Sequence, residues 1–130
     1  MKPQIDQGAM STLKVYLYAG CGTCRKAKKY LAEHDIQFTE IPIRERPPSV
    51  QELGAMLDAY DGAITRLFNT SGQDYRQGGY KEKLKTMSVE EIISELAANG
   101  NLIKRPFVIS DTTALIGFKQ EEWDRVFHIS

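Results

Sequence analysis

Two cysteines three residues apart place the tightest constraint on this chain, because they lie where one kind of secondary structure gives way to another. Cys21 and Cys24 are the only cysteines in the sequence. Before them, residues 13–18 alternate in polarity, which predicts a β-strand. After them, residues 25–34 contain neither glycine nor proline, and we expect a helix. A helix start favours the thiolate form of cysteine, and this spacing allows a disulfide. The pair therefore predicts a redox site.

Two other uses of such a pair are open. A structural zinc ion takes four ligands, and the only histidines, His34 and His128, are far apart in the sequence, so we expect no metal. Alternatively, both thiols could be small buried apolar groups, as free cysteines often are. The flanking glycines, the helix start and nearby cations such as Arg25 favour the redox interpretation.

The composition excludes several classes of partner. Seventeen lysines and arginines balance seventeen aspartates and glutamates, so we expect neither direct nucleic-acid binding nor a membrane partner. No stretch approaches the roughly 18 apolar residues of a membrane helix, and the N-terminus lacks the apolar core of a secretory signal. We therefore expect a cytoplasmic protein. A Cys-x-x-Cys pair is kept reduced there on average, which favours catalysis or sensing over a structural disulfide.

The length of 130 residues suits one domain with its own core. Residues 1–10 are polar and unpatterned, and we interpret them as a disordered leader or a remnant of an expression vector. Residues 11–130 are then expected to form a single domain.

The two ends of this domain carry the strand signals. A second strand over residues 36–43 would complete a βαβ unit, whose strands run parallel. Short apolar runs at residues 107–109 and 114–117 predict a β-hairpin, and a last helix is expected over residues 121–127. Together these segments predict a four-stranded mixed sheet.

The middle of the chain is predicted to be helical. Ser49 with Glu52 and Ser88 with Glu91 form capping-box patterns, each followed by apolar residues at helical spacing. Residues 64–68 predict a further helical turn. The fold class is therefore α/β: a four-stranded mixed β-sheet with flanking helices and an all-helical insertion.

A βαβ unit, a helical insertion and a ββα unit, with Cys-x-x-Cys at the first helix, resemble the thioredoxin-like fold of the arsenate reductase (ArsC)/Spx family. The residues that carry the resemblance are Cys21 to Lys26, Pro47 to Glu52, Asn69, Thr70, Leu102 to Pro106, Gly117 and Phe118. They span most of the chain.

The resemblance implies roles for individual residues. Cys21 takes the position of the nucleophile, Cys24 is the expected resolving thiol, and Arg105 takes the position of an arginine that binds an anionic substrate. Pro106 takes the position of a cis-proline that faces the thiol. Further candidate residues for substrate or anion binding are Gly22, Thr23, Arg25 and Asn69.

The implied activity is thiol-dependent reduction of an oxyanion or a disulfide by the Cys-x-x-Cys pair. No resident cofactor is expected. Glutathione is the expected co-substrate, with glutaredoxin or thioredoxin as protein partners.

Two departures from the reductase pattern affect the substrate. Where arsenate-reducing members place further arginines, this chain has Asn69 and the pair Gly117, Phe118, so the full arsenate clamp is not expected. Arg66 and Arg76 lie nearby in the sequence and could take their place. Cys24 is also a departure from reductases that rely on external resolving thiols.

The alternative is an Spx-like redox-sensing transcriptional regulator that binds RNA polymerase. The Cys-x-x-Cys pair is shared with that branch, and Gly62 falls near its polymerase-contacting glycine. The chain ends shortly after its last helix without the extended basic tail of those regulators, and we expect the reductase on this ground.

Overall fold

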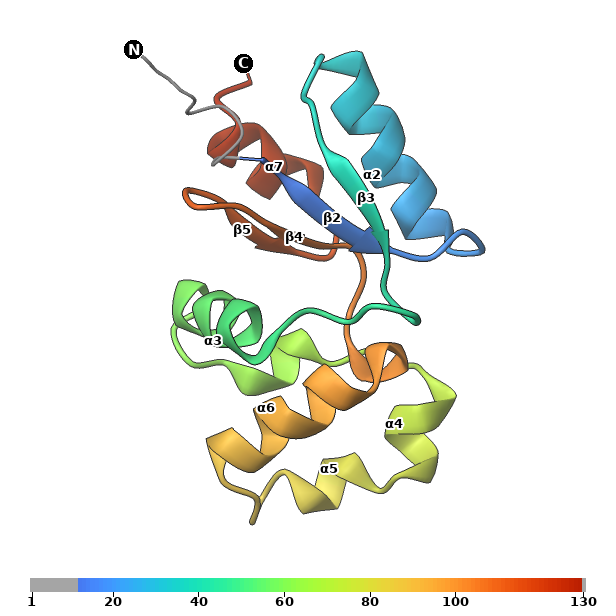
Figure 1. The fold of residues 1–130 in the computed structure, drawn as a ribbon, viewed down its shortest axis with the longest axis vertical. Helices are drawn as coiled ribbons and strands as arrows, with labels where there is room; N and C mark the ends of the chain where they lie inside the picture. The colour runs from blue at the N-terminus through green and yellow to red at the C-terminus, as the bar shows by residue number, and fades with distance from the viewer. Residues whose placement is uncertain (1–11, 130) are drawn as a thin grey trace.

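A four-stranded mixed β-sheet forms one half of the molecule (Figure 1). In the computed structural model, which describes residues 12–129, the strands lie in the order β3-β2-β4-β5. They are β2 (Lys14–Leu17), β3 (Thr39–Pro42), β4 (Phe107–Ile109) and β5 (Ala114–Ile116). β3 runs parallel to β2, whereas β4 pairs antiparallel with both β2 and β5. The predicted βαβ unit, β-hairpin and mixed sheet are confirmed.

Helices cover both faces of the sheet (Figure 1). On one face lie α2 (Gly22–Glu33) and α7 (Gln120–Val126), whose apolar sides share a buried cluster with Val15 of β2. The opposite face packs against α3 (Val50–Ala59), and Tyr16 of β2 is buried in that second cluster. The central strand therefore buries side chains on both faces, as expected for a strand covered by helices on either side.

An all-helical segment between β3 and β4 forms the other half of the molecule, as predicted (Figure 1). After α3 it comprises η1 (Ile64–Leu67), α4 (Gln73–Gln77), α5 (Tyr80–Lys83), α6 (Val89–Ala98) and η2 (Gly100–Leu102). The longest of these, α6, packs against α3 and so joins the insertion to the sheet. Within residues 12–129, no helix has the length and apolar character needed to cross a membrane.

Both predicted capping boxes are present. The Glu52 amide donates to Ser49 Oγ at 3.1 Å, and the Ser49 amide donates to Glu52 Oε1 at 3.0 Å. The same reciprocal pair joins Ser88 and Glu91, at 3.1 and 2.8 Å. Each box satisfies two backbone donors that the helix cannot pair by itself, which explains why α3 and α6 begin where the sequence predicts.

Glu52 also connects α3 to the sheet. Its carboxylate accepts hydrogen bonds from Tyr16 Oη at 2.7 Å and from Lys14 Nζ at 3.0 Å. Burial opposes ionisation, but the donors from Ser49, Tyr16 and Lys14 outweigh it, so the pKa of Glu52 is lowered. One side chain therefore caps a helix and fixes the position of that helix on β2.

The element boundaries differ from prediction mainly in two places. The strand predicted over residues 36–43 is shorter, because only Thr39–Pro42 pair with β2 and the preceding residues form the connection from α2. The short helices α4 and α5 were not predicted individually. They flank Gly78 and Gly79 and have no side-chain cap, so their sequence carries turn signals instead of helix signals. Residues 1–10, predicted to form a leader, lie outside the described residues.

Gly100 brings the backbone of the helical insertion close to the residue that follows β3. A Cβ atom at this position would lie 2.0 Å from the carbonyl oxygen of Ile43, which follows β3. No side chain fits there without moving the backbone. Gly100 therefore sets how closely η2 approaches the end of β3.

Substitution Gly100→Ala is expected to lower the free energy of unfolding by about 1–3 kcal/mol, because the new methyl group overpacks the contact with Ile43. Gly54→Ala is the matched control. It lies inside α3 with no atom within 4 Å of an added Cβ, and should raise stability by about 0.5–1 kcal/mol through helix propensity. Urea unfolding followed by circular dichroism measures both. Equal effects of the two alanines would contradict this role of Gly100.

Candidate functional site

Cys21 is the N-cap residue of α2. Its Sγ accepts a hydrogen bond from the Cys24 amide at 3.3 Å, and its own amide donates to the Tyr18 carbonyl at 3.1 Å. The thiol is half-buried, whereas Cys24, one turn further on, is 1% exposed. Both cysteines are free thiols. The predicted pair thus has one accessible member at the positive end of a 12-residue helix and one member in the core.

The two thiols differ sharply in acidity. Burial opposes ionisation of Cys21, but hydrogen bonds from the Cys24 side chain and amide and from the Arg105 guanidinium outweigh it, so its pKa is lowered. Burial, together with the hydrogen bond to Cys21, raises the pKa of Cys24 to about 12. One shared interaction therefore stabilises a thiolate on Cys21 and keeps the proton on Cys24.

Arg105 reaches this pair from the segment before β4. Its peptide bond to the buried Pro106 is cis, as the resemblance implied, and the Pro106 carbonyl accepts a hydrogen bond from the Gly117 amide at 2.8 Å. The guanidinium carbon lies 4.9 Å from the centre of the Tyr18 ring. Its Nε is buried and has no hydrogen-bond partner within the described part of the chain. Arg105 is also in none of the ion pairs found among residues 12–129, so its positive charge is available to the Cys21 thiolate.

A second arginine, Arg44, lies on the same tyrosine. Its guanidinium carbon is 3.7 Å from the centre of the Tyr18 ring. Arg44 and Arg105 also line one cavity of about 220 Å³, together with Asn69, Gly72, Gln73, Asp74 and Asn101. Cation–π contact can orient both guanidinium groups without neutralising them. The lining therefore combines two guanidinium groups with one carboxylate, that of Asp74, and several amide groups.

The structure places the predicted binding residues in two groups. Asn69 and Arg105, which are far apart in the sequence, line the same cavity. Gly22, Thr23 and Arg25 are exposed on the first turn of α2, directly after Cys21. Arg25 Nη2 lies close to the backbone of Gly22, 3.7 Å from where a Cβ would be. Roles for these residues in binding stay predictions.

Neither of the two arginines suggested by sequence proximity lines this cavity. Arg66 lies over the Tyr60 ring at 4.5 Å, and Arg76 lines a different cavity in the helical insertion. The arginine that lines it together with Arg105 is Arg44, which was not predicted. A signal was available, because Arg44 follows a strand parallel to β2, and the carboxyl ends of parallel strands meet at one edge of the sheet.

A larger cavity, of about 810 Å³, lies among the helices of the insertion. Arg105 lines the smaller cavity but not this one, and neither cysteine lines either of the two. We take the cysteine pair as the candidate site because the nucleophile, the altered thiol pKa values and the Arg105 guanidinium meet there. Within residues 12–129, no group of three or more His, Cys, Asp or Glu side chains could hold a metal ion.

The model of the ArsC family matches residues 16–126 of this chain. The chain belongs to the ArsC family. Its four-stranded mixed sheet with flanking helices is the thioredoxin-like arrangement of that family. The match includes both cysteines, Arg44 and the Arg105–Pro106 segment.

Relatives of this ArsC-family protein include proteins with different descriptions. It is 44% identical to the uncharacterized protein YusI of Bacillus subtilis, over 87% of this chain and 96% of YusI. It is 26% identical to the global transcriptional regulator Spx of Enterococcus faecalis, over 85% of this chain and 82% of Spx.

Two solved structures are similar to this chain along nearly their whole length. One is a putative ArsC family related protein from Bacteroides fragilis, with a TM-score of 0.81 and 41% identity, covering 88% of this chain and 98% of that one. The other is a possible arsenate reductase from Streptococcus mutans, with a TM-score of 0.80, 35% identity and the same coverage. The family thus includes proteins described as reductases and as regulators.

The pKa of Cys21 can be measured from the pH dependence of its alkylation by iodoacetamide. We expect a midpoint below the free-cysteine value of about 8.5, because Arg105 and Cys24 stabilise the thiolate. Arg105→Gln should raise the midpoint, since a charge and a donor are lost. For the part of the increase that lies above pH 7, the rate at pH 7 falls about tenfold for each pKa unit.

Arg25→Gln is the matched control for that measurement. Arg25 is much closer to Cys21 in the sequence than Arg105 is, but it is not among the groups that alter the pKa of Cys21. The midpoint should therefore stay unchanged in this variant. A shift in Arg25→Gln as large as in Arg105→Gln would contradict the assignment, provided that both variants keep the wild-type circular dichroism spectrum.

Proposed function

We propose that this ArsC-family protein is a cytoplasmic thiol-dependent reductase of small anionic disulfides. The observation that carries the proposal is the unequal thiol pair: Cys21 is accessible with a lowered pKa, and Cys24 is buried behind it with its pKa raised to about 12. In such a pair the ionised thiol attacks the substrate first, and the protonated thiol reacts only later, with the mixed disulfide that has formed.

The reaction would proceed in two exchanges. The Cys21 thiolate attacks one sulfur of the substrate disulfide, so that a bond from Cys21 Sγ to that sulfur forms, the substrate S–S bond breaks and one thiolate leaves. Cys24 then attacks Cys21 Sγ, its proton passes to the departing thiolate, and the second half of the substrate leaves as a thiol while a Cys21–Cys24 disulfide forms. Two electrons pass from the cysteine pair to the substrate.

The state of Cys21 would control when Cys24 reacts. In the reduced protein, the hydrogen bond to Cys21 contributes to the raised pKa of Cys24. Once Cys21 carries the substrate sulfur it has no negative charge, and this stabilisation of the Cys24 proton is lost. The resolving thiol thus becomes more acidic when a mixed disulfide is present beside it.

Arg105 and Arg44 would hold the anionic group of the substrate. Both contact Tyr18 and line one cavity, so two guanidinium groups are available there to an anion. Glutathione, glutaredoxin or thioredoxin would return two electrons to the Cys21–Cys24 disulfide. Arsenate is a second substrate to test. We favour disulfides because Cys24 is an internal resolving thiol and Asn69 replaces an arginine of the arsenate clamp.

Trapping the mixed disulfide tests this proposal. With oxidised glutathione as the probe, Cys24→Ser should accumulate a glutathione adduct on Cys21, because the resolving thiol is missing. Cys21→Ser should accumulate none, since Cys24 is buried and protonated. Intact-protein mass spectrometry measures the adduct. Equal adducts in the two variants would contradict the assignment of nucleophile and resolver.

The charge requirement can be tested in the Cys24→Ser background. Arg44→Gln should slow adduct formation with anionic oxidised glutathione about two- to fivefold, as expected for the loss of one partly exposed ionic contact. Its rate with cystamine, a cationic disulfide, should not fall. If the rate of adduct formation fell equally with both disulfides, Arg44 would not act by binding an anion.

A redox-sensing regulator that binds RNA polymerase is the second candidate function. The relatives described as Spx favour it, as does Gly62, which is exposed directly after α3 with φ of +80°. Purified RNA polymerase should then be retained by the immobilised protein, with retention that differs between the reduced and oxidised thiol pair. Absence of binding in both states would reject this candidate without affecting the reductase proposal.

A further inference from the structure

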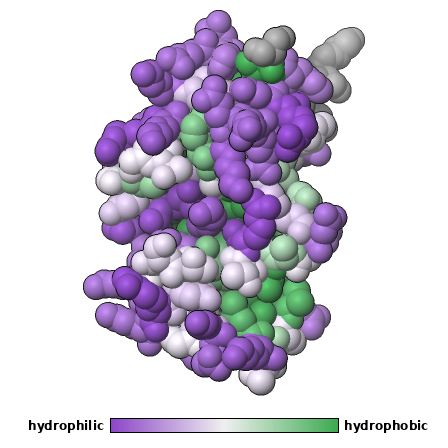
Figure 2. All heavy atoms as spheres, turned by 180° about the vertical axis from the view of Figure 1, so that it is seen from behind, coloured by the Kyte–Doolittle hydropathy of each residue, from purple (hydrophilic) through white to green (hydrophobic). Residues whose placement is uncertain are grey.

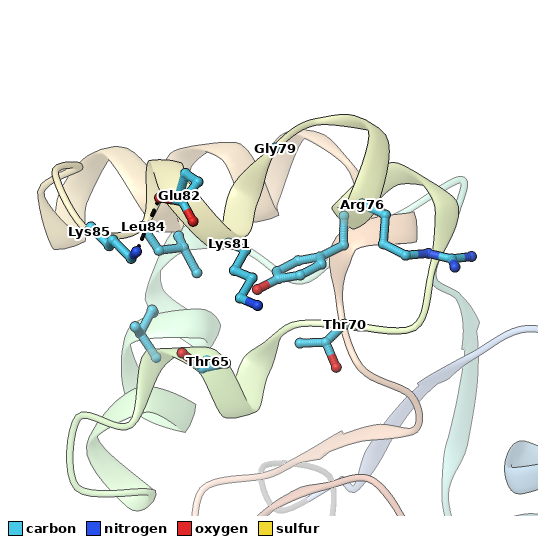
Figure 3. A pocket seen from close by; sticks show the side chains of 10 residues that line it. Thr65, Thr70, Arg76, Gly79, Lys81, Glu82, Leu84 and Lys85 are labelled. Atoms are coloured by element: carbon cyan, nitrogen blue, oxygen red, sulfur yellow. Dashed lines mark hydrogen bonds and ion pairs between the residues drawn. The ribbon is translucent and has the colours of Figure 1, made fainter.

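The larger cavity of the helical insertion is a groove between η1 and α5, on a different part of the molecule from the cysteine pair (Figure 3). Its volume of about 810 Å³ falls within the range of pockets that hold small molecules. The lining residues are Ile64, Thr65, Thr70, Tyr75, Arg76, Gly79, Lys81, Glu82, Leu84 and Lys85. They all come from the segment between α3 and α6.

The floor of this groove is apolar and held in place by aromatic packing. Ile64, Tyr75 and Leu84, which are half-buried, are the large apolar residues of its lining. The Tyr75 ring packs edge-on against Phe68 at 5.6 Å and stacks with Tyr80 at 6.1 Å. Figure 2 shows hydrophobic side chains gathered on the helical half of the molecule. The floor therefore exists without a ligand and is suited to an apolar body.

One wall of the groove carries positive charge. Lys81 extends from α5 into the space, toward the segment that carries Thr65 and Thr70 (Figure 3). Lys85 is paired with Glu82 at 3.1 Å, whereas Lys81 is in none of the ion pairs found among residues 12–129. The chain as a whole is neutral. Lys81 therefore supplies a positive charge that is local to the groove, opposite the hydroxyl groups of Thr65 and Thr70.

We propose that this groove binds a small amphipathic anion. An aromatic or aliphatic body would lie on Ile64, Tyr75 and Leu84, and a single carboxylate, sulfonate or phosphate would contact Lys81 and the hydroxyl groups opposite it. The apolar body of such a ligand matches the apolar floor of the groove, and its anionic group matches the cationic wall. The proposal is independent of the thiol chemistry.

Two fluorescent probes of similar shape distinguish the contribution of the anionic group from that of the apolar body. 8-Anilinonaphthalene-1-sulfonate carries the anionic group, and N-phenyl-1-naphthylamine has the same rings without it. We expect the full-length protein to bind the sulfonate saturably at one site. Lys81→Gln should weaken sulfonate binding about two- to fivefold, as expected for one exposed ionic contact, and should leave the uncharged probe unaffected.

Lys26→Gln is the matched control, because Lys26 is an exposed lysine on α2, outside the groove. It should change neither affinity. Leu84→Ser should weaken both probes, since it removes apolar floor. Thermal unfolding by circular dichroism must remain cooperative in each variant, so that binding to loosened protein is excluded.

Three results would overturn the proposal: no saturable binding of the sulfonate, an equal loss in Lys26→Gln and Lys81→Gln, or an equal loss of both probes in Lys81→Gln. Lys81 and Lys26 are exposed, so their variants are expected to fold, and the comparison between them decides the question even if Leu84→Ser does not fold.

Discussion

Burial of β2 on both faces is the constraint on which the rest of the structure depends. Val15 and Leu17 are buried with α2 and α7, and Tyr16 is buried with α3 and the insertion. Each residue of the strand thus faces one particular side of the sheet. A shift of the strand register by one position would move the side chains of each face to the other face. The register of β2 fixes where the strand ends, and so where Tyr18 and Cys21 emerge.

The candidate site is assembled at that end of the strand. α2 supplies Cys21 at its first turn, the segment after β3 supplies Arg44, and the segment before β4 supplies Arg105. Tyr18 follows β2 and contacts both guanidinium groups, whose central carbons lie 3.7 and 4.9 Å from the centre of its ring. A neutral ring can hold two cations in place while leaving their charge available, which a carboxylate in its position could not do.

The insertion contributes to both cavities through one stretch of chain. Asn69 lines the cavity at Arg105, whereas its neighbour Thr70 lines the larger groove. Asp74 and Tyr75 of α4 divide in the same way. The turn before α4 and α4 itself are therefore a wall shared by the two cavities. Gly100 keeps this half close to the end of β3, because its lack of a side chain permits backbone contact with Ile43.

The sequence by itself determined the features whose causes are local. Capping boxes at Ser49 and Ser88 act within four residues, alternation reports the two faces of a strand, and Cys21 and Cys24 meet through one helical turn. The fold class and the thiol pair could therefore be predicted. The family resemblance added Arg105 and the cis bond before Pro106.

Only the tertiary structure decided which distant side chains meet. Arg44 joins Arg105, while Arg66 and Arg76 point elsewhere, because the parallel pairing of β3 with β2 brings the end of β3 beside the cysteines. The unequal acidity of two identical thiols is decided in the same way. The difference follows from the burial of Cys24 and from the guanidinium of Arg105, some eighty residues later in the sequence. Neither cause can be inferred from the Cys-x-x-Cys spacing.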